Sequence, residues 1–136
     1  MNGLKPGMKH ELTVEATPDM AASKFVEGTP NVFATAAMVA LIEQTCKDLV
    51  QPYLGENQTT VGVHIDASHI APTPIGMKVT AKAELIEIDG RRLEFSVEVF
   101  DEVEKISDAR HTRFVIDLVK FESKTLKKFE KAKQRI

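Results

Sequence analysis

The longest apolar run of the chain is VFATAAMVALIEQ, residues 32–44, which predicts a helix that continues to about Tyr53. The segment QPYLGENQ, with its proline and glycine, ends it. A helix that is apolar on every side is typically buried on every side, so we expect the first half to be a core helix. Its second half is amphipathic and leaves Lys47 and Asp48 available to water.

Alternating polar and apolar positions predict strands before and after this helix. The clearest alternation is MKVTAKAELIEI, residues 77–88, where Val79, Ala81 and Leu85 share one face. The dipeptide Asp89-Gly90 then indicates a tight hairpin. The predicted strands are residues 10–16, 59–71, 77–88, 93–100 and 106–121, with a loop over residues 17–31.

The order of these elements is a short strand, one long helix and four strands joined by tight turns. Strands joined by hairpins form an antiparallel sheet, and a lone apolar helix is buried only if that sheet curls around it. The fold class is therefore α+β. Because one sheet does not cover a helix on all sides, we expect a second subunit to supply part of the burial. A cystatin-like α+β fold is the alternative, but it places its helix nearer the N-terminus.

Length and charge narrow the class of protein. The 136 residues suit one domain over residues 1–121, followed by a basic tail or short helix over residues 122–136. The net charge of −2 favours neither nucleic acid nor membrane as a partner. The single cysteine, the lack of metal-ligand spacing, and a start without the apolar core of a leader peptide suit a cytoplasmic protein that binds no metal.

Three side chains are candidates for chemistry. Counting alternate residues from Val61 places His69 on the apolar face of its strand, toward the helix. Glu43 follows the apolar run of the helix, and an inward carboxylate needs a hydrogen-bond donor. An imidazole would serve, and such a pair would raise the histidine pKa.

Thr35 lies eight residues before Glu43, about 12 Å along the helix axis. An imidazole with a hydrogen bond at each nitrogen spans roughly 8 Å between its two partner oxygens. Side chains lean toward the helix N-terminus, so His69 can bridge the two. Hydroxyl, imidazole and carboxylate in one line follow the nucleophile–base–orienter logic of acyl transfer.

Each candidate also has a purely structural explanation. Thr35 can cap the helix, Glu43 can be the first surface residue of an amphipathic half, and His69 can be a core histidine bonded to a backbone carbonyl. Gly62 can mark a bulge, or it can let a substrate approach the sheet closely.

The motifs VFAT, LIE and HIAPTPIG, with their spacing, resemble the hot-dog fold acyl-CoA thioesterases, in particular their fluoroacetyl-CoA thioesterase-like members. The resemblance runs from GMKHELTVEA to VIDLVKF. It implies a curled antiparallel sheet wrapped around one long helix. It also implies hydrolysis of a small acyl-CoA by a homodimer with interface active sites, and no cofactor apart from the coenzyme A of the substrate.

The resemblance also assigns roles to residues. It implies Thr35, Glu43 and His69 as the catalytic set, with Gly62, Arg113 and His69 at the substrate. The lid over the acyl pocket would comprise Phe25, Val26, Thr29 and Phe33. Val26 and Thr29 stand where the fluoroacetyl enzyme has phenylalanines, so a preference for fluorinated substrates is not implied. A non-catalytic acyl-CoA-binding protein and a hot-dog enoyl-CoA hydratase are the alternatives.

Overall fold

The computed structural model describes residues 2–135 as five strands and three α-helices, with two short 3₁₀ turns. The strands are β1 (Lys9–Glu15), β2 (Gln58–Ala67), β3 (Lys78–Asp89), β4 (Arg92–Phe100) and β5 (Lys105–Asp117). The α-helices are α1 (Ala22–Phe25), α2 (Thr35–Val50) and α3 (Leu118–Gln134), and the 3₁₀ turns are η1 (Pro18–Met20) and η2 (Gln51–Tyr53).

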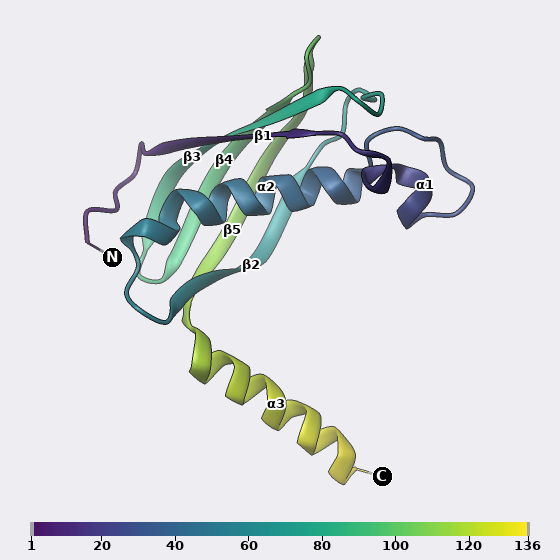
Figure 1. Ribbon diagram of the computed structural model, residues 1–136. Helices are drawn as coiled ribbons and strands as arrows, with labels where there is room; N and C mark the ends of the chain where they lie inside the picture. Colours follow the sequence, from purple (N-terminus) through teal and green to yellow (C-terminus); the bar gives the residue numbers. More distant parts are fainter. Residues whose placement is uncertain (1, 136) are drawn as a thin grey trace.

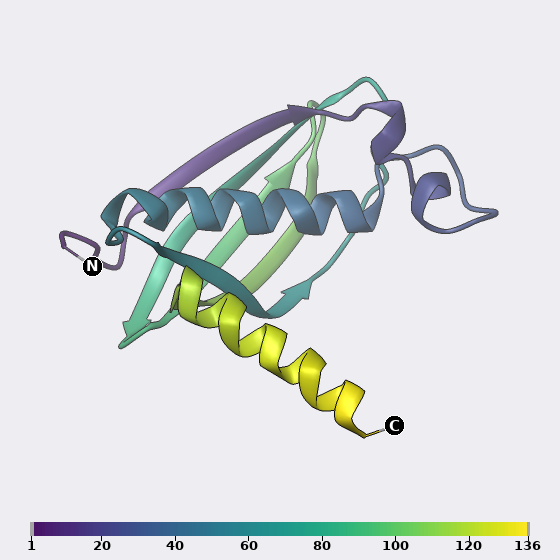
Figure 2. The same cartoon turned by 60° about the horizontal axis from the view of Figure 1, so that its bottom comes forward.

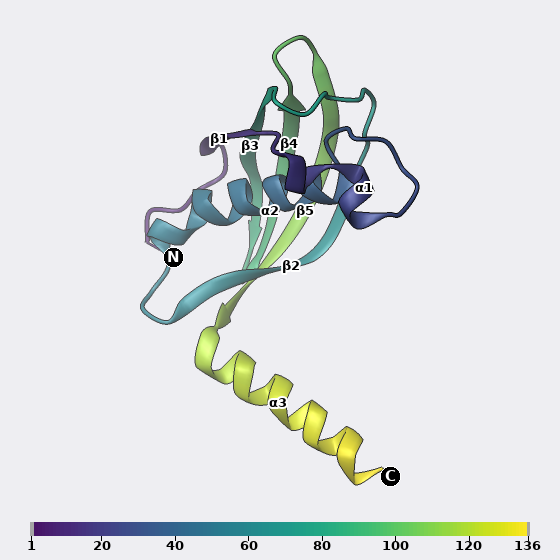
Figure 3. The same ribbon diagram turned by 45° about the vertical axis from the view of Figure 1, so that its right-hand side comes forward.

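All five strands form one antiparallel sheet in the order β1-β3-β4-β5-β2. The sheet curls around α2, with β1 along one side of the helix and β2 along the other (Figures 1 and 2). The predicted α+β arrangement, a curled sheet around one long helix, is therefore confirmed. The side-on view shows α3 leaving the end of β5 and extending away from this body (Figure 3).

The alternation of polar and apolar residues over residues 77–88 forms a strand with one buried face, as predicted. Val79, Ala81, Ala83 and Leu85 are buried and face α2, while the intervening residues are exposed or half-buried. The predicted hairpin joins β3 to β4 through Gly90, whose φ of 59° lies in the left-handed region that glycine adopts readily. Cys46 on α2 is fully buried in the same core.

The core helix is less enclosed than its composition suggests. Met38, Ile42 and Cys46 are buried against the sheet, but Ala36 and Ala40 are exposed on the opposite face of α2. As expected for one sheet, the single chain covers only part of the helix circumference; whether a second subunit covers the rest stays a prediction.

The C-terminal boundary also differs from the prediction. The last strand ends at Asp117, not residue 121, and α3 begins at Leu118, four residues before the predicted tail. The segment LVKF contains no proline or glycine to mark the change from strand to helix, and Thr125 already bonds the carbonyl of Phe121 within the helix. None of the helices in residues 2–135 is long and apolar enough to cross a membrane.

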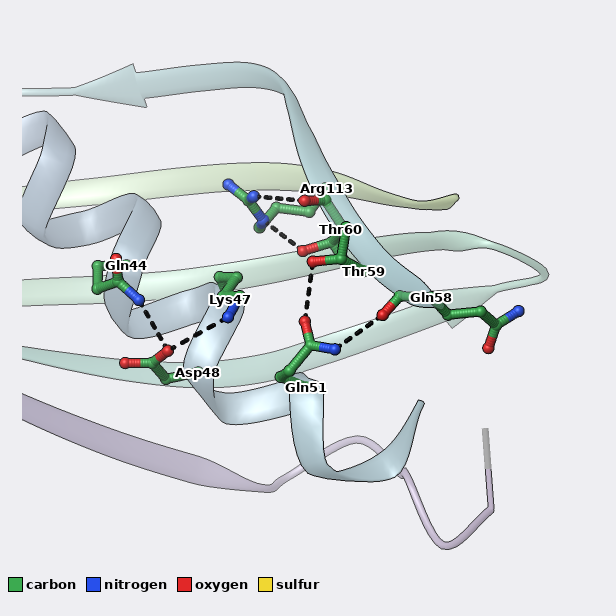
Figure 4. Close-up of polar contacts among 8 residues, drawn as sticks. All are labelled: Gln44, Lys47, Asp48, Gln51, Gln58, Thr59, Thr60 and Arg113. Carbon is green, nitrogen blue, oxygen red and sulfur yellow. Dashed lines mark hydrogen bonds and ion pairs between the residues drawn. The ribbon is translucent and has the colours of Figure 1, made fainter. Parts of the chain in front are cut away.

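Strand β2 is a sheet edge with an irregular register. Its pairing with β5 shifts between Gly62 and His64, so one residue bulges, and Val63 is 58% exposed. Gln51, just after α2, holds the start of β2 through the carbonyl of Gln58 and the hydroxyl of Thr59 (Figure 4). The helix and the edge strand that carry the candidate residues are thus joined at this end.

Candidate active site

The hydroxyl of Thr35 lies 2.7 Å from Nδ1 of His69, so the first link of the predicted relay is formed. Thr35 is the first residue of α2, and the N-cap residue, Ala34, makes no side-chain capping bond. The threonine therefore does not cap the helix. His69 lies just beyond β2, in a segment that Ser68 and Ile70 keep paired with β5 through backbone bonds.

The second nitrogen of His69 has no protein partner. Nε2 is buried, and no group in residues 2–135 hydrogen-bonds to it. Burial lowers the pKa of His69 below its usual 6.5, which favours the neutral ring. The expected rise in pKa required a nearby carboxylate, and within residues 2–135 no carboxylate hydrogen-bonds to this ring. In a neutral His69 whose Nδ1 carries no hydrogen, Nδ1 accepts a hydrogen bond from the Thr35 hydroxyl. This is the arrangement of a general base and the group that it deprotonates.

A cleft of about 290 Å³ opens beside this pair. Its walls include Phe33, Ile70 and Pro72, so the hydroxyl and the imidazole lie at an apolar surface. The cleft also adjoins the first turn of α2. The first intrahelical backbone bond is donated by Met38 to Ala34, which leaves the preceding amide groups of the turn available to an anion.

Glu43 lies in a second cluster. Its Oε1 accepts a hydrogen bond of 3.3 Å from Nη1 of Arg113, and the glutamate side chain is 45% exposed. The donor that the carboxylate needs is therefore the guanidinium of Arg113, and not His69 as expected. Within residues 2–135 no hydrogen bond joins Glu43 to His69, so the predicted three-membered line is half formed in one chain.

Arg113 is almost fully buried and its guanidinium is held on three sides. Nε and Nη2 donate to the hydroxyl and the carbonyl of Thr60 at 2.7 and 2.9 Å (Figure 4). Nη1 lies 3.1 Å from Nε2 of His111. Sequence reasoning did not single out His111 or Thr60. The signal for His111 was the alternation of the last strand, which places Ala109, His111, Arg113 and Val115 on one face.

Of the four proposed lid residues, Phe33 is the one that lines the cleft described above. Phe33 is 1% exposed and lines the cleft beside Thr35. Phe25 and Val26 are largely exposed, and the Thr29 hydroxyl donates to the carbonyl of Val26. In this single chain, Ala22 and Val32 border the cleft from that side instead.

Gly62 is surrounded by the second cluster. A Cβ atom added there would lie 2.5 Å from Glu43 Oε1, 3.1 Å from His111 Cε1 and 3.3 Å from Arg113 Nη1. The bulge explanation is confirmed, since the register of β2 shifts beside Gly62. The missing side chain has a further consequence, because it lets the carboxylate of Glu43 approach the strand.

We expect Gly62→Ala to displace Glu43 and to lower kcat/KM by about 10- to 100-fold, the usual cost of misplacing a reacting group by about an ångström. Steady-state turnover measures the effect. Gly55→Ala is the matched control, since its Cβ would meet only the flexible end of Gln58. Equal activity of the two variants would show that the position of Glu43 is unimportant.

The curled antiparallel sheet around a central helix is the hot-dog fold, which the chain shares with solved thioesterases and with a hot-dog-like protein. A family model described as fluoroacetyl-CoA-specific thioesterase (FlK) matches residues 16–119. The chain belongs to this family.

Individual relatives agree. The fluoroacetyl-CoA thioesterase of Streptantibioticus cattleyicolor is 42% identical over 99 residues, which are 73% of this chain and 71% of that protein. The crystal structure of a mutant of the fluoroacetyl-CoA-specific thioesterase FlK matches with a TM-score of 0.90 and 34% identity, over 94% of this chain and 99% of that one. A hypothetical protein of Thermus thermophilus, a thioesterase superfamily member, matches with a TM-score of 0.91 and 25% identity, over 98% and 99% of the two chains.

Proposed function

We propose that the protein hydrolyses a small acyl-CoA thioester to the free acid and coenzyme A. The observation that carries this proposal is the Thr35 hydroxyl at 2.7 Å from a histidine whose pKa is lowered, at the wall of an apolar cleft. A hydroxyl that is hydrogen-bonded to a neutral imidazole is either an activated nucleophile or a group that positions the attacking water. Family membership supports the same reaction class.

In the proposed reaction, the Thr35 hydroxyl or a water beside it adds to the thioester carbonyl as His69 takes the proton. The amide groups of the first turn of α2 stabilise the oxyanion, because the positive end of the helix dipole lies there. The carbon–sulfur bond then breaks, and His69 returns the proton to the leaving thiolate. If the acyl group is on Thr35, a water repeats the addition. The reaction needs only water and the CoA thioester, with no further cofactor.

Glu43 and Arg113 have the remaining roles in the proposal. The carboxylate orients and polarises the attacking water or the imidazole, and the guanidinium keeps that carboxylate ionised and fixed. Arg113 and Gly62 border the acyl group. Phe33 lines the cleft and limits the length of the acyl chain that fits there. Phe25 and Val26 are exposed and do not cover the cleft, so we propose only a weak preference for a fluorinated acyl group.

Thiol release from a panel of acyl-CoAs tests the function. We expect turnover of acetyl-, propionyl- and fluoroacetyl-CoA, with fluoroacetyl-CoA preferred by less than about tenfold in kcat/KM, a difference of ~1.4 kcal/mol. Calorimetry with a non-hydrolysable acyl-CoA accompanies the assay. Tight binding without release of thiol from any substrate would identify a non-catalytic binding protein instead, and hydration of enoyl-CoA alone would identify a hydratase.

We also propose that the protein is a cytoplasmic homodimer with its active sites at the subunit interface. Three features support an interface here. The face of α2 that carries Glu43 also exposes the small residues Ala36 and Ala40. Next to it, β2 is an open sheet edge with unpaired backbone groups. The buried Nε2 of His69 has no hydrogen-bond partner among the described residues. In the proposed dimer, the second copy supplies this partner. The single unpaired cysteine suits a reducing compartment.

A further inference from the structure

His111 is a fully buried histidine behind the candidate site. It lies on β5 at 1% exposure, with the ring of Phe95 tilted against it at 6.3 Å between centroids. A polar ring in such a place is costly unless both nitrogens have partners. Both have one, so the position of the imidazole is fixed by bonds at each end.

These two bonds determine the protonation state of His111. Nδ1 lies 2.8 Å from the backbone carbonyl of His64, which is only an acceptor, so Nδ1 carries the hydrogen. Nε2 lies 3.1 Å from Nη1 of Arg113, which is only a donor, so Nε2 must offer its lone pair. Only the neutral ring with hydrogen on Nδ1 makes both bonds.

Nη1 of Arg113 carries two hydrogens, and the structure gives each a partner. One is directed to Nε2 of His111, and the other to Oε1 of Glu43. With Nε and Nη2 bound to Thr60, the plane of the guanidinium is fixed, and one hydrogen of Nη1 is directed at the carboxylate. Oε2, the second oxygen of Glu43, has no hydrogen-bond partner among the described residues. It is therefore available to accept a hydrogen bond from the attacking water or the imidazole.

We propose that His111 is a positioning residue for the thioesterase reaction, whose neutral imidazole holds Arg113 so that the guanidinium fixes Glu43 beside Gly62. This inference rests on the proposed function, because it assigns Glu43 a role in turnover. The chain of bonds runs from the His64 carbonyl at the β2 bulge through His111 and Arg113 to Glu43. The bulge, which shifts the register at this carbonyl, thereby contributes to the geometry of the site.

Protonation of His111 breaks this chain. A second hydrogen on Nε2 would face Nη1, two donors and two cations in contact. The charged groups around the ring are Arg113 on its own strand, Glu43 on α2 and Glu94 on β4. Burial and the Arg113 charge lower the pKa of His111 below 6.5, although the His64 bond and the two acids oppose this. Acidification below this pKa therefore releases Arg113 and lowers activity.

Three variants of the full-length protein test the proposal. His111→Gln keeps an acceptor that reaches Arg113, His111→Asn keeps a donor to the His64 carbonyl but does not reach Arg113, and His111→Phe keeps only the shape. We expect kcat to fall at least about tenfold in the Asn and Phe variants and to be largely restored in Gln. His10→Gln, on the opposite edge strand β1, is the matched control.

The pH profile and a double-mutant cycle separate positioning from a merely structural role. We expect the acidic limb of kcat/KM to fall with two protons in the wild type, from His69 and His111, and with one in His111→Gln. In a Glu43→Gln background, His111→Asn should cause no further loss.

Equal activity of the Gln and Asn variants, or multiplicative losses in the cycle, would overturn the proposal. If His111→Phe does not fold, the comparison of His111→Gln with His111→Asn still tests the role of His111. Wild-type turnover is measured in parallel. An inactive wild type would contradict the proposed function, whereas an active wild type with active Asn and Phe variants contradicts only the role of His111.

Discussion

Glu43→Gln reduces thioester hydrolysis by about 1,000-fold, within the range that a positioned acid or base contributes, while the fold is retained. The amide oxygen of glutamine still accepts the bond from Nη1 of Arg113, so the buried guanidinium keeps a partner. The negative charge is lost, and with it the ability to orient and polarise a water or the imidazole. Single-turnover thiol release from acetyl-CoA measures the effect.

Glu102→Gln, in the exposed turn between β4 and β5, is the control for this substitution. Its turnover and thermal midpoint should equal those of the wild type. Circular dichroism verifies that the Glu43 variant is folded. Hydrolysis by Glu43→Gln at the wild-type rate would show that Glu43 is only the counter-ion of Arg113.

Ala40→Arg converts the proposed dimer into monomers and abolishes activity. Ala40 is exposed on the face of α2 that carries Glu43, where a small side chain lets another backbone approach closely. An unpaired guanidinium buried between two copies raises the dimer dissociation constant at least about 100-fold, or ~3 kcal/mol. By symmetry the substitution acts on both copies. Sedimentation equilibrium should report twice the 15.1 kDa of one chain for the wild type and a single chain for the variant.

Glu102→Arg introduces the same charge away from this face and should remain a fully active dimer. Two results would contradict the interface. An Ala40→Arg dimer would place the contact elsewhere, and an active Ala40→Arg monomer would show that one chain contains a complete site.

Elements with a regular pattern could be predicted from the sequence. The alternation of residues 77–88 and the Asp89-Gly90 turn gave the strand faces and the hairpin correctly, because both depend on local backbone geometry. The start of α3 at Leu118 could not be found, since no proline or glycine separates this helix from β5. Exposure of Ala36 and Ala40 could not be found either, because composition does not reveal how far a sheet curls.

The contact between Thr35 and His69 was predicted correctly, but from an incomplete argument. Strand parity placed His69 on the face toward the helix. However, β2 ends at Ala67 and contains a bulge, so regular alternation does not extend from Val61 to His69. The bond between Glu43 and Arg113 within one chain was missed, because strand parity was applied to β2 and not to β5. Applied to β5, it places His111 and Arg113 on the inner face together.

The burial of Cys46 simplifies the measurement on which every experiment above depends. Its side chain is inaccessible in the core, and burial raises the pKa of the thiol to about 12, so it remains protonated at assay pH. A reagent that detects thiolates therefore reports released coenzyme A and not the folded enzyme. Unfolding exposes one thiol per chain, so the same reagent counts any denatured protein in a variant preparation.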